Sequence, residues 1–186
     1  MMTRTVALVM SLIICSAFAM AQDAPKAEVF GGYQYLHASS GVSGVDGFNL
    51  NGWNGALNGF FNRHVGITAD FSGTYGKPSV LGVGVSTHLY TYMFGPVVRA
   101  GNDSKLSPFA HVLFGGAHVS GSVDAGGGLN VSTSDSGFAW AAGGGVDYKA
   151  TERFAIRLGQ FDFLQTHISG DSQNNFRYSG GVVVRF

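Results

Sequence analysis

Apolar and polar residues alternate along most of this chain with a period of two, which is typical of a strand with one apolar face and one polar face. The clearest case covers residues 65–75. One face of that segment carries Val65, Ile67, Ala69, Phe71, Gly73 and Tyr75, and the other carries Gly66, Thr68, Asp70, Ser72 and Thr74. The segment therefore predicts an amphipathic strand that lies between an apolar and a polar environment.

The same alternation recurs along the chain and predicts an all-β, antiparallel fold. The eight predicted strands cover residues 27–38, 50–61, 65–75, 87–100, 107–120, 137–149, 153–167 and 175–186. The long connections are 39–49, 76–86, 121–136 and 168–174, and short turns lie between them. Long and short connections in alternation are typical of an up-and-down barrel whose two ends face different compartments.

Three places depart from simple alternation. Proline removes a donor from the strand ladder, so we expect a bulge or weak pairing at Pro96. The apolar parity changes within 153–167, and a bulge near Gly159 and Gln160 would return its large apolar side chains to one face. The parity of 107–120 stays open. Its two candidate apolar faces carry Phe109, His111 and Leu113 or Ala110, Val112 and Phe114.

The N-terminal residues predict an export signal. A positive residue, a short apolar core and the small-x-small motif Ala19-Met20-Ala21 follow one another in the order of a secretory signal peptide. We therefore assign residues 1–21 to a signal peptide that is cleaved after Ala21. The length of the remaining chain suits one domain, which we assign to residues 22–186.

The composition suits neither a disordered chain nor a helical membrane protein. Glycine accounts for 29 of 186 residues and aromatic residues for 13%, whereas charged residues make up 12%, about half the usual share. No segment outside the N-terminus is continuously apolar over the length of a membrane helix. The formal net charge of zero gives no indication of nucleic acid binding. Cys15, the single cysteine, falls in the signal peptide, so the mature domain has no thiol chemistry.

Charged residues and aromatic residues occupy opposite faces of the predicted strands. The charges on the polar faces are Asp70, Arg99, Asp147, Lys149, Arg157, Arg177 and Arg185. An eight-stranded barrel has an interior just wide enough for side chains, and large aromatics on every strand would overfill it. We therefore expect the aromatic faces to contact lipid and the charges to pair inside the barrel, which fills the lumen and leaves no useful pore.

The last predicted strand, 175–186, resembles the closing strand of bacterial outer-membrane β-barrels. Its apolar face carries Phe176, Tyr178, Gly180, Val182, Val184 and Phe186. With the signal peptide, the eight alternating segments, the ending V-V-V-R-F and the run R-L-G-Q-F-D-F-L, it makes the mature chain similar to the small eight-stranded proteins typified by the transmembrane domain of outer membrane protein A.

This resemblance implies a fold, a place and partners. The fold is an eight-stranded antiparallel up-and-down transmembrane β-barrel, and the place is the bacterial outer membrane. The partners are outer-membrane lipid and lipopolysaccharide, together with the barrel assembly machinery, which reads a terminal aromatic residue, here Phe186. We expect a monomer that binds no nucleic acid.

Candidate chemistry is sparse, and we predict no catalytic, cofactor-binding or metal-binding residues. The six histidines are His37, His64, His88, His111, His118 and His167. They are scattered, and none has metal-ligand spacing to a cysteine or an acidic residue. The main expectation is therefore a non-enzymatic integral barrel with a structural or surface-interaction role.

Two alternatives remain open. The triplet His167-Ile168-Ser169 resembles the His-x-Ser pair of lipid A deacylases, which are also eight-stranded barrels. That chemistry needs a serine nucleophile, a histidine base and an acid that orients the base. Gly170 replaces the asparagine that follows in that family, and Asp171 is close in sequence for the role of a distant acid. The second alternative is a soluble exported barrel that binds a small apolar ligand.

Overall fold

The computed structural model describes residues 27–39, 47–77, 79–80, 83–100, 104–124, 130–168 and 170–186. The strands are β1 (Ala27–Ala38), β2 (Phe48–Phe60), β3 (Val65–Gly76), β4 (Ser79–Val80), β5 (Val83–Arg99), β6 (Leu106–Asp124), β7 (Asn130–Lys149), β8 (Phe154–Ile168) and β9 (Asp171–Arg185). No helix in the described ranges is long and apolar enough to span a membrane. The predicted signal peptide, residues 1–21, lies outside these ranges.

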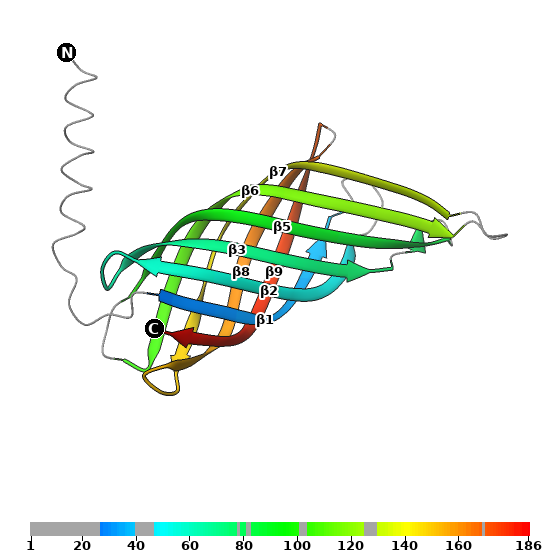
Figure 1. Cartoon of the computed structure of the whole chain (residues 1–186). Coiled ribbons are helices and arrows are strands. Elements are labelled where there is room, and N and C mark those ends of the chain that lie inside the picture. Colours follow the sequence, from blue (N-terminus) through cyan, green and yellow to red (C-terminus); the bar gives the residue numbers. More distant parts are fainter. Residues whose placement is uncertain are drawn as a thin grey trace, which may run out of the picture.

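Eight long strands close into one antiparallel barrel (Figure 1). β1 pairs with β2 on one side and with β9 on the other. The pairing of β3 with β5 completes the wall, and β4 is a two-residue strand that pairs with the beginning of β5. The backbone groups of the wall therefore bond from strand to strand around the cylinder. The predicted eight-stranded up-and-down barrel is confirmed.

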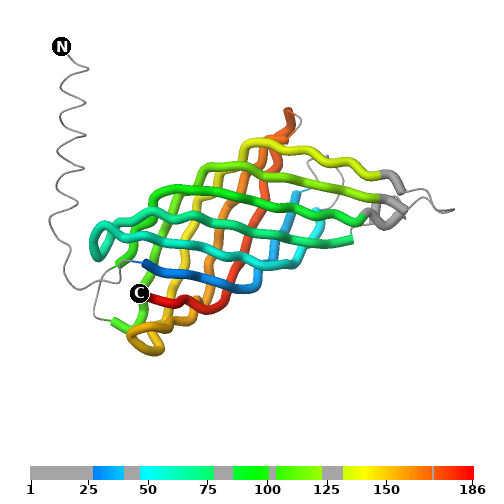
Figure 2. Tube along the Cα trace, in the orientation of Figure 1, coloured from blue at the N-terminus to red at the C-terminus, as the bar shows by residue number. Residues whose placement is uncertain are grey.

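The beginning of β1 and the end of β9 meet at one end of the barrel, which we call the terminal end; the other is the distal end (Figure 2). The Phe186 backbone N–H donates to the Ala27 carbonyl oxygen at 2.9 Å. The described turns 61–64 and 150–153 also lie at the terminal end. The last residue of the chain is thus bonded directly to the first barrel strand.

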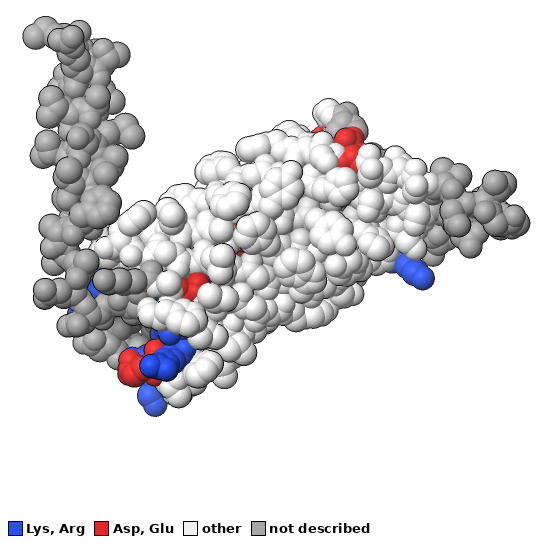
Figure 3. Space-filling view, in the orientation of Figure 1, with Lys and Arg blue, Asp and Glu red and all other residues white. Residues whose placement is uncertain are grey.

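Side chains alternate between the lumen and the outer surface, as the sequence predicted. In β3, the exposed fractions of Val65, Ile67, Phe71 and Tyr75 are 38–55%, and those of Thr68, Asp70, Ser72 and Thr74 are 1–4%. Uncharged residues cover most of the visible wall, and charged residues gather toward the two ends (Figure 3). The barrel is therefore apolar outside and polar inside, the reverse of a soluble barrel.

The predicted bulge in β8 is present. Relative to β9, β8 gains a residue between Arg157 and Gln160, and its register with β7 shifts at the same level. Ile156 and Phe161, which have opposite parity in the sequence, are both exposed on the outer surface. The extra residue places two apolar runs of opposite parity on the same side of the wall.

The structure also settles the pairing around Pro96 and the parity of β6. The ladder between β5 and β6 skips Pro96 without a change of register, so the expected weak pairing is confirmed there. In β6, His111 and Leu113 are buried in the lumen, whereas Val112 and Phe114 are exposed. The even-numbered side chains of β6 therefore face lipid.

Three predicted loops are wrong in part, because strands extend further at the distal end. Residues 76–86 were expected to be a loop, but they contain β4 and the beginning of β5. Residues 121–136 were expected to form the longest loop, but residues 121–124 of β6 pair with residues 130–133 of β7. Residues 168–174 were also expected to be a loop, but β9 begins at Asp171. The turn before it uses Gly170, whose φ of 88° costs glycine little. Strand propensity is weak in serine and glycine, and the ladder of the neighbouring strand overrides it.

The alternation in β3 leads to a labelling prediction. Phe71→Cys should react with a lipid-phase thiol reagent, and Ser72→Cys should not, because adjacent residues face opposite sides of the wall. The measurement is the fraction labelled in the folded, membrane-embedded mature protein, which has no other cysteine if the signal peptide is removed. Equal labelling of the two variants would contradict the assigned faces.

Candidate functional site

The lumen holds charged side chains in equal numbers of each sign. Among the described residues, the buried carboxylates and guanidinium groups are Glu28, Asp70, Asp147 and Asp162 with Arg99, Arg157, Arg177 and Arg185. A buried charge without a partner costs several kcal/mol, and four carboxylates against four arginines allow every charge to be compensated. The lumen is therefore strongly polar and formally neutral when His111 is uncharged.

Arg177 joins opposite parts of the wall. Its Nη1 donates to Asp70 Oδ1 at 2.7 Å, and its Nε donates to Asp162 Oδ2 at 2.7 Å. β2 and β1 separate β3, which carries Asp70, from β9, which carries Arg177, so this contact crosses the lumen. Asn54 of β2 donates to the other oxygen of Asp70 at 3.0 Å. A single fully buried guanidinium group thus holds three strands in place.

Asp162 extends this network toward the terminal end. Its Oδ1 lies 2.8 Å from His111 Nε2, and its Oδ2 accepts from Gln160 Nε2 at 2.7 Å. The Gln160 side-chain oxygen accepts from Arg157 Nη1 at 2.7 Å. Arg157 also donates to the two oxygens of Asp147, at 2.8 and 3.2 Å. The chain of contacts connects β6, β7 and β8 inside the barrel.

A second charged group closes the terminal end. Glu28 on β1 pairs with Arg99 on β5, and Arg185 Nε on β9 lies 2.9 Å from Glu28 Oε1. The Arg99 guanidinium also lies 4.0 Å from the centre of the Phe60 ring, an attractive cation–π geometry. With this group, every one of the eight barrel strands contributes at least one side chain to the luminal contacts.

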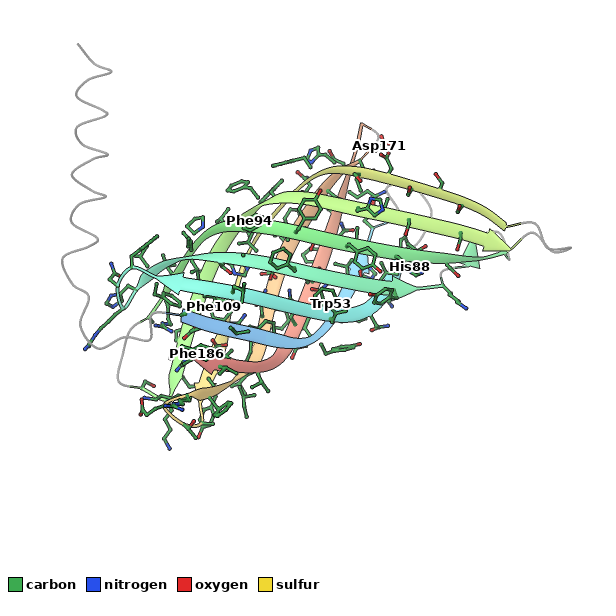
Figure 4. All side chains as sticks on the ribbon, viewed as in Figure 1. Trp53, His88, Phe94, Phe109, Asp171 and Phe186 are labelled. Carbon is green, nitrogen blue, oxygen red and sulfur yellow. The ribbon has the colours of Figure 1, made fainter. Side chains whose placement is uncertain are left out.

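Two aromatic rings pack against Arg157 in the lumen. The Arg157 guanidinium carbon lies 4.2 Å from the centre of the Phe30 ring and 4.2 Å from that of Phe109. Figure 4 places Phe109 toward the terminal end. Two rings, the Asp147 carboxylate and the Gln160 side-chain oxygen therefore replace the hydration of this cation.

The sequence identified most of these charges but not all. Asp70, Arg99, Asp147, Arg157, Arg177 and Arg185 lie in the lumen as predicted. Lys149 is a correction: its side chain is 35% exposed at the terminal rim and pairs with Glu152 at 2.7 Å. Glu28, Asp162 and His111 were missed as luminal residues. The predicted bulge places Asp162 between outward-facing phenylalanines and could have revealed it, whereas the ambiguous parity of 107–120 concealed His111.

An apolar cluster lies in the distal half of the lumen, and no pattern in the sequence predicted it. Its buried members are Leu36, Leu50, Leu89, Met93, Leu113, Ala117, Ala139, Ala141 and Leu164. They come from six strands, and Phe48, Val119 and Ile168 pack against them. An apolar side chain in the lumen has the same appearance in the sequence as one that faces lipid. The cluster and the buried hydroxyl groups of Thr74 and Thr91 lie on the distal side of the charged network.

Little space remains beside the charges. The cavity between Asp70, Arg99, Arg157 and Gln160 holds about 10 Å³, which is about the volume needed for a single water molecule. A small-molecule site is typically at least about 300 Å³. The cavity beside these charges therefore offers no room for a substrate or a cofactor.

The residues of the hydrolase alternative lie at the distal rim. His167 is exposed on the outer surface, and its ring centre lies 6.3 Å from that of Phe138. Asp171 is exposed at the beginning of β9 (Figure 4). Ser169 lies outside the described residues. Within the described ranges, no group of three or more His, Cys, Asp or Glu side chains could hold a metal ion.

The apolar outer surface, the closed ladder and the filled polar lumen define a transmembrane β-barrel. The chain matches the family model of the outer membrane protein beta-barrel domain over residues 5–186 and belongs to that family. A soluble exported barrel, the second alternative from the sequence, is contradicted by the apolar outside and the filled lumen. In outer-membrane barrels the short turns face the periplasm, and the described turns 61–64 and 150–153 lie at the terminal end.

Solved structures with this fold come from several bacteria. Ail, the attachment invasion locus protein of Yersinia pestis, is 18% identical with a TM-score of 0.63, and the match covers 87% of this chain and 99% of Ail. Neisserial surface protein A is 14% identical with a TM-score of 0.67, covering 89% and 100% of the two chains. The N-terminal barrel domain of Pseudomonas aeruginosa OprF is 14% identical with a TM-score of 0.51, covering 88% and 100%. No curated protein matches.

Removal of Arg177 should destabilise the barrel strongly. Arg177→Met leaves Asp70 and Asp162 without their shared partner, so we expect the free energy of unfolding in lipid vesicles to fall by about 3–5 kcal/mol. Lys149→Met is the control, because its ion pair is exposed and should be worth about 0–1 kcal/mol. Urea unfolding of both variants provides the comparison. Equal losses would show that the luminal pairs do not hold the wall together.

Proposed function

We propose that this protein is a non-enzymatic integral barrel of the outer membrane, with a structural or surface-interaction role and a closed lumen. The observation that carries this proposal is the occupied interior, with a charged network toward the terminal end and an apolar cluster toward the distal end. The proposal includes the orientation, with the terminal end in the periplasm and the distal end facing outward. A transport role would need a continuous path between them. The surfaces left for interaction are the lipid-facing wall and the outer rim.

The hydrolase alternative receives little support from the rim. Catalysis by a serine needs a histidine base held by an acid, and the ring contact described for His167 is with Phe138. The exposed His167 would have to be oriented by a group brought to it by a substrate or by residues outside the described ranges. We therefore assign no catalytic role to His167 or Asp171.

The proposal includes the route to the membrane. Residues 1–21 act as a signal peptide that is cleaved after Ala21, and residues 22–186 enter the outer membrane as a monomer through the barrel assembly machinery. The exposed Phe186 ring on the outer surface of the closing strand supports recognition of that strand. Outer-leaflet lipid, including lipopolysaccharide, surrounds the distal half of the wall.

A lipid analysis tests the absence of enzymatic activity. Lipid A from cells with and without the protein should have the same acyl composition by mass spectrometry, because the described rim residues place no acid against His167. His167→Ala should leave the lipid A profile unchanged too. Loss of an acyl chain in the presence of the protein, abolished by His167→Ala, would replace the proposal with the hydrolase.

A second prediction concerns assembly. Phe186→Ser should reduce the amount of folded, membrane-embedded protein much more than Ser172→Ala at matched expression. Burial of a phenylalanine side chain is worth about 1.5–3 kcal/mol, which is insufficient to unfold a barrel, so the defect should appear mainly in insertion. Ser172 is exposed at the outer rim and should tolerate substitution. Equal assembly of the two variants would remove Phe186 from the recognition signal.

A further inference from the structure

Three strands continue beyond the lipid-facing wall at the distal end. β7 pairs with β6 from Asn130, but its pairing with β8 begins only at Phe138. β5 likewise pairs with β6 from Val85, while its pairing with β3 begins at Thr87. The projecting sheet of β5, β6 and β7 therefore stands outside the membrane on one side of the barrel (Figure 1).

The register of this sheet produces a sharp change in chemistry along its outer face. Partners across β5, β6 and β7 form rows of three residues. From the membrane outward the rows are Phe94–Phe114–Trp140, Tyr92–Gly116–Phe138, Tyr90–His118–Ser136, His88–Ser120–Ser134 and Ser86–Ser122–Ser132. Aromatic side chains thus give way to imidazole and hydroxyl groups within two rows.

The aromatic-to-polar boundary locates the membrane surface. Tyr75 contacts Tyr90 and His88 edge-on, with ring centres 5.9 and 5.2 Å apart, and its hydroxyl accepts from Trp53 Nε1 at 3.3 Å. Tyrosine and tryptophan gather at the level of the lipid headgroups. Figure 4 shows His88 closer to the distal end of β5 than Phe94. The rows beyond Tyr90 therefore lie at and above the headgroups of the outer leaflet.

A groove of about 320 Å³ lies over these outer rows. The side chains that define it are Ser86, His88, Ser120, Ser122, Ser132 and Ser134. None of its described lining residues is acidic or apolar. The volume is in the range of small-ligand sites, and the lining consists of groups that both donate and accept hydrogen bonds.

Neighbouring groups favour an anionic, polyhydroxylated ligand. Lys77 is exposed at the distal end of β3, next in sequence to Gly76, the β3 partner of Thr87. His118 Nδ1 lies 2.7 Å from Ser136 Oγ in the row beneath it. A lysine and two imidazoles can donate to phosphate oxygens, while a ladder of serine hydroxyls suits the hydroxyl groups of a sugar.

We propose that this outer face, defined by Ser86, His88, Ser120, Ser122, Ser132 and Ser134 and called here the serine face, binds the phosphorylated sugar headgroup of an outer-leaflet glycolipid. The serine face is continuous with the lipid-contacting aromatic rows of the same strands, so a glycolipid whose acyl chains lie against Phe94, Phe114 and Trp140 has its headgroup in the groove. The inference rests on the proposed function for the position of the barrel in the outer membrane.

The test compares lipid environments. Mature protein is folded in phospholipid vesicles that contain either lipopolysaccharide or phosphatidylglycerol at matched negative charge. The midpoint of thermal unfolding should be about 5 °C or more higher with lipopolysaccharide, because a ligand bound only by the folded state stabilises it. The double variant Ser120→Val with Ser134→Val should lose at least half of this rise.

The control variant removes two hydroxyl groups elsewhere. Thr87 faces the other side of β5, and Ser172 lies on the rim at β9. The double variant Thr87→Val with Ser172→Val should keep the full rise in the midpoint of thermal unfolding. An equal rise in both double variants, or no difference between the two lipids for the wild type, would overturn the proposal. Heat-modifiable migration reports folding in each sample, so a failure of the barrel to insert is recognised separately as a failure of the proposed function.

A second measurement uses the protein without any substitution at the serine face. In protein with isotope-labelled histidine, the imidazole signals of His88 should shift when lipopolysaccharide replaces phosphatidylglycerol, whereas those of His64 in the periplasmic turn should not. Shifts of equal size at His88 and His64 would overturn the proposal even if the serine variants fail to fold.

Discussion

The hydrogen-bonding requirement of the backbone inside a bilayer is the constraint on which this structure depends. The hydrocarbon region offers no water to N–H and C=O groups, so strands can cross it only in a closed cylinder. The pairing of β1 with β9 and the bond from Phe186 to Ala27 meet that requirement. Closure with eight strands then leaves an interior just wide enough for side chains, so every second residue of each strand must fit there.

The narrow interior determines both the chemistry of the lumen and the surfaces that remain for function. Charges in it must be paired, and Arg177 with Asp70 and Asp162 meets this condition across the barrel. The apolar cluster around Leu113 and Met93 occupies part of the other half. Because side chains occupy so much of the interior, we expect recognition to take place on the outside of the wall and at its outer rim.

The sequence predicted the features that depend on alternation alone. The faces of β3 and the bulge before Gln160 follow from the need to keep large apolar side chains on one side of a wall. The apolar cluster could not be predicted, because alternation does not distinguish a luminal Leu113 from a leucine that faces lipid. Residues 121–124 of β6 and 130–136 of β7 were predicted to be loop because serine and glycine are weak strand formers. Only the register of the paired strands shows that they belong to strands. The luminal position of Asp162 could have been predicted once the bulge had been assigned.

Planar-bilayer recording of the folded, purified barrel tests the closed lumen most directly. The measured quantity is the single-channel conductance at fixed voltage and salt. With a charge-paired network and an apolar cluster in series, and a cavity of about 10 Å³ beside the charges, the account predicts no steady conductance above that of the protein-free bilayer. Large, long-lived current steps from the wild-type protein would show that the lumen is open, and would contradict the account.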